Sequence, residues 1–290
     1  MIRAAGIRLR FHPLFVLLLG LSLLTGYFVE MLTLFGIVFI HELGHAAAAR
    51  SFGWKVTEIQ LLPFGGVAVV EDSGAIPARE EIAVALAGPL QNGWMALLAQ
   101  FMLHAGWGNP DWWAYFLEAN LMLALFNLLP VLPLDGGKIT QALMSYGLSY
   151  YRTLLAGSLV SLVLSVFVIA ASLFGREGGL QLNLLAIGLF LLSSNWYGYR
   201  HLPFQFLRFL MARGSRFART LPRGTLARPL LVPGGMTVRE ILRLFMREQV
   251  HLVFILDEVG QIRQIVPEQP LIDSYFDAEK TNRAVSDLFL

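Results

Sequence analysis

Cysteine is absent from the 290-residue sequence, and charged residues make up only 14% of it, whereas 56% is hydrophobic. Without cysteine the chain has no disulfides and no thiolate metal sites, and the redox compartment stays undecided. A soluble protein carries roughly 25% charged residues, so most of this chain belongs in a membrane. The net charge is only +2. So small a net charge creates no strong positive potential that would attract nucleic acid, and we expect no direct nucleic-acid partner.

Six segments are long and apolar enough to cross a bilayer, since a spanning helix needs about 20 such residues. The first segment, residues 13–29, could instead be a cleavable signal peptide, because arginines precede it. No clear small-x-small cleavage site follows it, so we expect a retained helix. The sequence predicts a polytopic α-helical membrane protein with six transmembrane helices and a small carboxy-terminal α/β domain. The predicted spans are residues 13–29, 32–51, 81–104, 112–130, 153–174 and 180–199.

The basic residues of the loops are unevenly distributed. With the amino terminus in the cytosol, Arg176 is the only basic residue of an outside loop. Cytosolic loops carry an excess of lysine and arginine, so the bias predicts a multi-pass protein of a bacterial inner membrane with both termini in the cytosol. The basic residues that fall inside are Arg3, Arg8, Arg10, Arg50, Lys55, Arg79, Lys138, Arg152 and Arg200.

Composition changes after residue 200 and divides the chain into three parts. Residues 1–200 form the predicted six-helix domain, and residues 201–228 are rich in arginine and contain no acidic residue. This stretch is either an amphipathic segment on an anionic leaflet or a solvated basic linker. Residues 229–290 show strand and helix patterns, including a hairpin across DEVGQ. A unit of about 60 residues is marginal alone, so we expect it to dock on a partner copy.

The motif His41-Glu42-Leu43-Gly44-His45 lies in an otherwise apolar run. Two imidazoles at i and i+4 share one helix face and can reach a single metal ion, and the adjacent glutamate can act on water bound to that metal. Zn²⁺ suits this set, because it accepts imidazole and carboxylate ligands and leaves a position for water in catalytic sites. The alternative is a pair of core histidines bonded to neighbouring carbonyls, which is costly inside a membrane.

A third ligand is required, and the predicted topology selects Asp135. Its segment follows the fourth predicted span, which runs from outside to inside and ends at the membrane level of the two histidines. Asp135 could also cap the helix expected near Lys138, and the two roles are compatible. Asn127, near the end of the same span, either binds a substrate backbone or bonds to a neighbouring helix. Four other candidates lie toward the outer face: Glu30, His104, Asp111 and Glu118.

HELGH, followed about 90 residues later by Asn127-Leu-Leu-Pro-Val-Leu-Pro133-Leu-Asp135-Gly-Gly, resembles the site-2 protease family of intramembrane zinc metalloproteases, peptidase family M50. The resemblance implies that His41, His45 and Asp135 bind Zn²⁺ and that Glu42 is the catalytic base. It also places Asn127 and Pro133 near bound substrate. Phe64 and Gly65, in Leu62-Pro-Phe-Gly-Gly66, resemble a short looped element of the family that pairs with substrate.

Six spans plus a carboxy-terminal unit resemble the branch of this family that carries cystathionine-β-synthase-type (CBS) units. The resemblance implies regulated proteolysis of a membrane-associated substrate, here a sporulation pro-sigma factor, and a location on the mother-cell side of the outer forespore membrane. It also implies inhibitory membrane proteins as partners and ATP at the CBS unit. Because CBS units usually work in pairs and only one is present, we expect a homo-oligomer.

Two other classes of function are open. A pseudoprotease would bind membrane segments without cutting them, but it has little reason to keep Glu42 and Asp135 beside both histidines. A transporter regulated by the CBS unit would need a polar path. Few intramembrane charges and no second polar helix are present to line one.

Overall fold

The computed structural model describes residues 2–289 except positions 5, 6, 12, 63, 64, 71–75, 175–179, 221–223, 225, 278 and 279. The chain forms two compact units, and each is described by itself. The first comprises Met1–Asp72 and Arg79–Ile139, and the second comprises Ser73–Ala78 and Thr140–Leu290.

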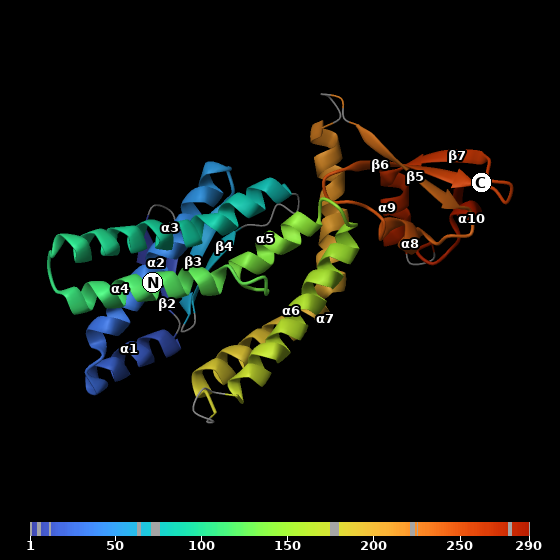
Figure 1. Ribbon diagram of the computed structural model, residues 1–290. Helices are drawn as coiled ribbons and strands as arrows, with labels where there is room; N and C mark the ends of the chain where they lie inside the picture. Colours follow the sequence, from blue (N-terminus) through green and yellow to red (C-terminus); the bar gives the residue numbers. More distant parts are fainter. Residues whose placement is uncertain are drawn as a thin grey trace. The chain divides into compact units, whose positions relative to one another are not determined.

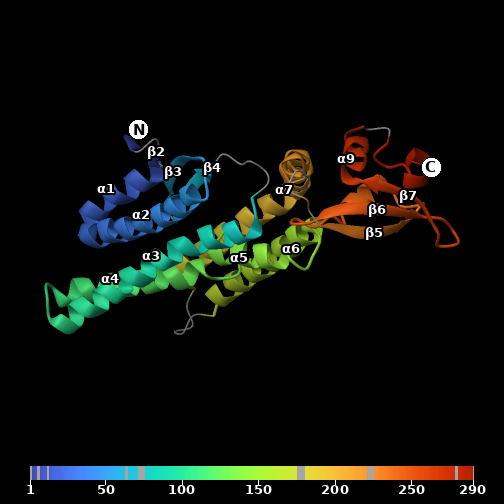
Figure 2. The ribbon, with the colours of Figure 1, turned by 90° about the horizontal axis from the view of Figure 1, so that it is seen from above.

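The first unit is built on four long helices and the start of a fifth. They are α1 (Pro13–Thr25), α2 (Phe28–Ser51), α3 (Ala78–Ala105), α4 (Pro110–Asn127) and α5 (Asp135–Met144). Helices α3 and α4 run side by side (Figures 1 and 2). Asn109 is the N-cap of α4. Its side chain accepts hydrogen bonds from the backbone N–H groups of Asp111 and Trp112, which have no partner within the helix.

The first unit also contains a four-stranded sheet in the order β1-β2-β3-β4, which was not predicted from the sequence. Its strands are β1 (Ile2–Ala4), β2 (Ile7–Phe11), β3 (Val56–Leu62) and β4 (Gly65–Val70). Strands β2 and β3 are parallel, so the chain between them, which includes α1 and α2, forms the crossover. Strands β3 and β4 pair antiparallel, and in the segment predicted as a short loop Leu62 ends β3 opposite Gly65 of β4, whereas positions 63 and 64 lie outside the described residues.

Three described helices are long and apolar enough to span a membrane: Phe28–Ser51, Ala78–Ala105 and Tyr150–Ser172. The other predicted spans coincide with α1, α4 and the first part of α7 (Leu182–Thr220). Helix α1 has only 13 residues, which is fewer than the roughly 20 that cross a bilayer. All six segments are helical, and the count of six membrane passes stays a prediction.

The second unit contains the helix pair α6 (Tyr150–Ser172) and α7. Small and polar residues of α6 are buried, among them Gly157, Ser161 and Ser165, and Asn195 of α7 donates a hydrogen bond to Ser165 at 3.3 Å. Small residues let membrane helices approach closely, and polar ones add hydrogen bonds between them. The pair runs side by side in both views (Figures 1 and 2).

Residues 201–220, predicted as part of a basic linker, continue α7 as a single helix of 39 residues. Arg213 in this stretch is only 7% exposed, so it lies neither on a lipid surface nor in solvent as both readings of the linker required. Leu202, Phe206, Phe209 and Leu210 of the same stretch belong to one buried apolar cluster with the carboxy-terminal domain. A shared core therefore joins this domain to α7.

The carboxy-terminal domain has a strand-helix-strand-strand-helix order. The parallel strands β5 (Ala227–Pro233) and β6 (Val250–Leu256) flank α8 (Val238–Leu242), and β7 (Ile262–Pro267) pairs antiparallel with β6. Helices α9 (Glu268–Phe276) and α10 (Val285–Phe289) follow. The hairpin predicted across DEVGQ is confirmed: the N–H of Asp257 donates to the carbonyl of Gln261, and Gly260 takes a φ of 83°.

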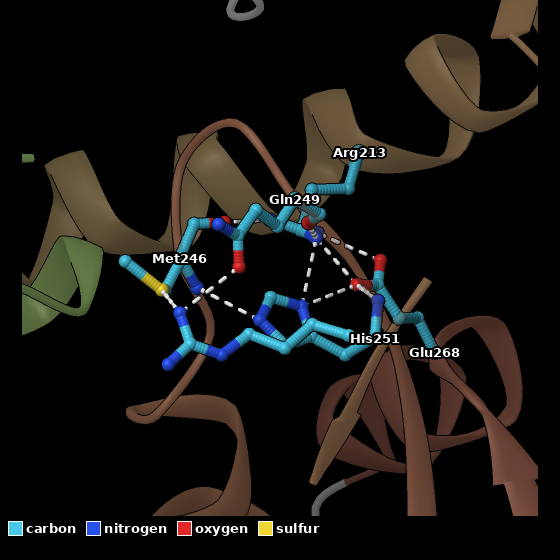
Figure 3. A network of polar contacts seen from close by, with 6 residues as sticks. Arg213, Met246, Gln249, His251 and Glu268 are labelled. Carbon is cyan, nitrogen blue, oxygen red and sulfur yellow. Dashed lines mark hydrogen bonds and ion pairs between the residues drawn. The ribbon is translucent and has the colours of Figure 1, made fainter. Parts of the chain in front are cut away.

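Arg213 is the centre of a buried polar network that ties α7 to this domain (Figure 3). Its guanidinium binds both carboxylate oxygens of Glu268 and donates to the carbonyls of Met246 and Gln249. His251 accepts the N–H of Met246 on Nε2, so its other ring nitrogen donates to Glu268 at 2.8 Å. Burial alone would raise the pKa of Glu268, but the hydrogen bonds from His251 and Arg213 outweigh it and lower that pKa.

Candidate metal centre

Helix α2 places His41, Glu42 and His45 in the first unit, all of them buried. The two imidazoles are one helical turn apart, and their Nε2 atoms lie 3.1 Å from each other. One carboxylate oxygen of Glu42 and a ring nitrogen of each histidine lie within 4.8 Å of one another. The helix thus brings together the three side chains that the HELGH motif predicted.

Asp135, the first residue of α5, meets the histidines from a distant part of the chain. Its Oδ2 lies 3.2 Å from Nε2 of His41 and 3.1 Å from Nε2 of His45. Its Oδ1 accepts a hydrogen bond from Lys138 at 3.2 Å, which fixes the orientation of the carboxylate. The three donor atoms therefore form a nearly equilateral triangle of 3.1–3.2 Å.

This triangle fits a zinc ion. Ligands about 2.0–2.1 Å from a tetrahedral zinc ion are about 3.3 Å apart, close to the spacing of the donor atoms. Two imidazoles and a carboxylate are also a donor set that zinc accepts in catalytic sites. A Cβ atom added at Gly88 of α3 would lie 2.3 Å from Nε2 of His45 and 2.6 Å from Nε2 of His41. A glycine therefore keeps the space beside both donor atoms free of side chains.

Helix α3 also holds the opposite edge of each imidazole. The carbonyl of Val84 accepts a hydrogen bond from Nδ1 of His45 at 2.7 Å, and Oδ1 of Asn92 lies 2.6 Å from Nδ1 of His41. Val84, Gly88 and Asn92 are four residues apart and share one helix face. This face matches the four-residue spacing of the histidines on α2. Hydrogen bonds of this kind orient metal-binding histidines and set their tautomer.

The first turn of α5 needs glycine for its close packing. A Cβ at Gly136 would lie 2.1 Å from the carbonyl oxygen of Leu128, and one at Gly137 would lie 2.5 Å from the backbone nitrogen of Leu132. Both approaches are far shorter than real Cβ contacts, so no larger residue fits without moving the backbone. The two glycines let the start of α5 lie against residues 128–132, which positions Asp135.

The structure describes three of the four predicted substrate-binding residues. Asn127 donates a hydrogen bond to the carbonyl of Leu123 in its own helix at 3.1 Å, and Pro133 is exposed after a cis peptide bond. Gly65 begins β4 opposite Leu62. Phe64 lies outside the described residues.

Gly88, Asn92 and Asn120 were missed in the sequence. Both asparagines are fully buried in apolar helices, and Nδ2 of Asn92 donates to Oδ1 of Asn120 at 3.1 Å. A polar side chain inside a predicted membrane helix was a usable signal, since such residues need a partner. The partner itself was invisible, because it depends on how α2, α3 and α4 pack.

Comparison with known proteins agrees with this geometry. The model of peptidase family M50 matches residues 29–108 and 99–148, a region that contains every donor atom of the triangle. Stage IV sporulation protein FB of Bacillus subtilis is 33% identical over 284 residues, which are 98% of this chain and 96% of that protein. The chain belongs to peptidase family M50.

A protein sequence and a solved structure from Methanocaldococcus jannaschii are also similar to the chain. A zinc metalloprotease of Methanocaldococcus jannaschii is 37% identical over 159 residues, which are 51% of this chain and 46% of that protein. The solved structure of a site-2 protease from the same organism has a TM-score of 0.55 at 29% identity, covering 69% of this chain and 94% of the other. As a member of family M50 the chain is an intramembrane metalloprotease. The alternative of a transporter is therefore rejected.

Proposed function

We propose that His41, His45 and Asp135 bind a catalytic zinc ion and that Glu42 is the general base of peptide hydrolysis. The observation that carries this proposal is the triangle of 3.1–3.2 Å between two imidazole nitrogens and one carboxylate oxygen. A structural pair of core histidines would not need a third donor from a helix 90 residues away. The pattern also gives a pseudoprotease little reason to keep all four residues together.

Each group has a distinct part in the reaction. His41, His45 and Asp135 would hold the zinc ion, which would supply Lewis-acid chemistry toward water and a peptide carbonyl. Glu42 takes the proton of the attacking water and returns it to the leaving amine. Lys138 keeps Oδ1 of Asp135 engaged, so that Oδ2 stays directed at the two histidines.

The test is a zinc determination and a cleavage assay on the same purified chains. We expect about one zinc per wild-type chain, zinc without cleavage for Glu42→Gln, and loss of zinc for Asp135→Ala. Glu118→Gln in α4 is the matched control and should keep both properties. A wild-type chain without zinc would contradict the metal assignment, and an active Glu42→Gln would contradict the role of the base.

For the substrate, we propose a membrane-associated protein, in particular a sporulation pro-sigma factor. Support comes from the similarity to stage IV sporulation protein FB across nearly the whole chain. The substrate backbone would pass Asn127, Pro133, Phe64 and Gly65. Co-expression with candidate precursors tests this, and a zinc-loaded chain that leaves every precursor intact would contradict it. Inhibitory membrane proteins are proposed as regulators and would lower cleavage in the same assay.

For the membrane, we propose six passes with both termini in the cytosol of a bacterium, at the mother-cell side of the outer forespore membrane if the substrate is a sporulation factor. The loop biases in lysine and arginine support this orientation. Because the chain has no cysteine, single cysteines can be introduced without background. Labelling from outside should reach a cysteine at the exposed position 107 and not one at the exposed position 258, and the reverse would overturn the orientation.

For regulation, we propose that residues 229–290 form a CBS-type domain that binds ATP and joins two copies of the chain. The strand-helix-strand-strand-helix order supports a CBS-type fold for this domain. An apolar outer sheet face supports the joining of two copies, since Leu231, Phe254 and Ile265 form one cross-strand row, and Leu231 and Ile265 are more than half exposed. Equilibrium binding of ATP to the purified chain tests the proposed ATP binding, and absence of binding would contradict it.

A further inference from the structure

Three buried polar side chains connect α2, α3 and α4 next to the metal centre. His41 approaches Asn92 at 2.6 Å, Asn92 donates to Asn120 at 3.1 Å, and Asn120 donates to the carbonyl of Phe116 at 2.8 Å. Asn92 and Asn120 have no exposed surface. The chain of contacts therefore runs from the proposed ligand to a backbone carbonyl through two fully buried side chains.

The last member of this chain determines the orientation of all the others. A backbone carbonyl can only accept, so the amide NH₂ of Asn120 faces Phe116 and its oxygen faces Asn92. Asn92 must then present its NH₂ to Asn120 and its oxygen to His41. That oxygen accepts a hydrogen only if His41 carries it on Nδ1. A neutral imidazole with its hydrogen on Nδ1 has its lone pair on Nε2, the atom that faces Asp135 and His45.

We propose that Asn92 and Asn120 are positioning residues that hold His41 in the tautomer required for metal binding. This inference rests on the proposed zinc site. Neither asparagine supplies one of the three donor atoms, and both act through the ring of His41. If the amide of Asn92 were reversed, its NH₂ would face Nδ1 and favour the tautomer with hydrogen on Nε2, which cannot bind a metal through that atom.

The two proposed histidine ligands differ in how their tautomers are held. His45 donates Nδ1–H to the carbonyl of Val84, an acceptor that belongs to the backbone of α3 and that no side-chain substitution removes. His41 depends on the side chain of Asn92, which can be reversed unless Asn120 holds it. Sensitivity to side-chain substitution should therefore concentrate at residues 92 and 120.

A simpler reading is that the asparagines only bind the three helices together, as polar residues do in membrane proteins. The two readings differ in what an aspartate at position 92 should do. A carboxylate has two oxygens and no N–H, so it accepts from Nδ1 of His41 in either orientation. Under the positioning role, Asn92→Asp keeps the zinc affinity and no longer needs Asn120.

The measurement is zinc affinity of the purified full-length chain, obtained by competition with a chelator of known affinity. We expect Asn92→Leu to weaken zinc binding by about 10–100-fold, the usual effect of losing a hydrogen bond to a metal-binding histidine. Asn92→Asp should retain most of the wild-type affinity. Asn195→Leu is the matched control, since Asn195 is also buried and bonds between helices, to Ser165, outside this site, and its affinity should be unchanged.

A double-mutant cycle separates positioning from packing. Asn120→Leu should weaken zinc binding when residue 92 is asparagine and should not weaken it in the Asn92→Asp background. Thermal unfolding of each detergent-solubilised variant shows whether the fold is intact. Equal losses from Asn120→Leu in both backgrounds, or a loss with Asn92→Asp as large as with Asn92→Leu, would overturn the inference.

The outcomes also separate this inference from the proposed function. If the wild-type chain binds zinc and cleaves while Asn92→Leu binds zinc equally tightly, only the positioning role is lost. If the wild-type chain binds no zinc, the metal assignment itself is wrong. Reduced affinity in Asn92→Leu, restored by aspartate, supports both.

Discussion

At the scale of residues, each of the three proposed metal ligands has a hydrogen-bond partner. An unpartnered polar group in an apolar interior costs several kcal/mol, about 2–7 by most measures. His41 and His45 avoid this cost because each forms a hydrogen bond with an acceptor on α3. Asp135 avoids it through its contacts with Lys138 and the two imidazoles. The buried motif is therefore stable only when α2, α3 and α5 come together, which ties the chemistry to the fold.

Gly88 offers the sharpest test at this scale. We expect Gly88→Ala to reduce zinc affinity and cleavage by at least about tenfold, because its Cβ would displace the donor atoms of both histidines. Gly93→Ala in the same helix is the control, since a Cβ there meets nothing within 4 Å. Chelator competition and the cleavage assay measure both. Wild-type affinity in Gly88→Ala would show that the ligands can shift to accommodate a methyl group.

At the scale of elements, α7 acts as a continuous connection between the apolar helix pair and the carboxy-terminal domain. Its carboxy-terminal half contributes to the apolar core of that domain and also supplies Arg213. The guanidinium carbon of Arg213 lies over the rings of Phe209 and Phe245, 5.1 Å from the centroid of each. A charge enclosed in this way needs its carboxylate partner, so Glu268 stabilises the docking of the domain together with the shared apolar core.

The pH dependence of this docking follows from Glu268. Its pKa is lower in the folded chain than its ordinary value of 4.5, so the unfolded chain binds the proton more readily. The stabilisation is therefore complete above about pH 4.5 and is lost as the pH falls below that value. We expect the denaturant midpoint of the solubilised chain, followed by circular dichroism, to fall between pH 7 and pH 4.

The contribution of Glu268 can be isolated by substitution. Glu268→Gln should lower the free energy of unfolding at pH 7 by about 3–5 kcal/mol, because it leaves a buried guanidinium without its charge partner. It should also remove part of the acid sensitivity. Glu258→Gln, at an exposed loop position, is the control and should behave as wild type. An identical acid response in wild type and Glu268→Gln would show that other carboxylates account for it.

At the scale of the whole molecule, the outer face of the carboxy-terminal sheet is not covered by the other described residues of the second unit. Its side chains are apolar on all three strands, and the alternate residues of β6, namely His251, Val253 and Ile255, are buried on the inner face. A soluble domain seldom leaves such a surface open unless a partner covers it. The residues of the outer face, in cross-strand order, are Pro229, Leu252 and Pro267, then Leu231, Phe254 and Ile265, then Pro233, Leu256 and Ile262.

If a second copy covers this face, a charge at its centre should separate the copies. We expect Phe254→Glu to convert the solubilised chain from a dimer to a monomer, measured by light scattering with the detergent mass subtracted. Val259→Glu is the control, because Val259 is 82% exposed in the β6–β7 turn and not on the sheet face. A wild-type monomer, or a dimer that persists in Phe254→Glu, would contradict the proposal.

The sequence alone indicated which residues form the candidate metal centre. Histidines at i and i+4 with an adjacent glutamate, inside an apolar helix, specify both the ligand type and its geometry, because helical periodicity is local. Asp135 could be selected because helix order and direction limit which loop reaches the same level. The helical segments and the hairpin at residues 257–261 were likewise set by local pattern.

Only the tertiary structure decided what surrounds that centre. The hydrogen bonds of Asn92 and Asn120 and the closeness of Gly88 depend on the separation of packed helices, which no local pattern encodes. The amino-terminal sheet was missed because its parallel pairing joins residues about 50 positions apart. Arg213 was predicted in a surface linker because composition cannot show that Glu268, 55 residues later, folds back to neutralise it.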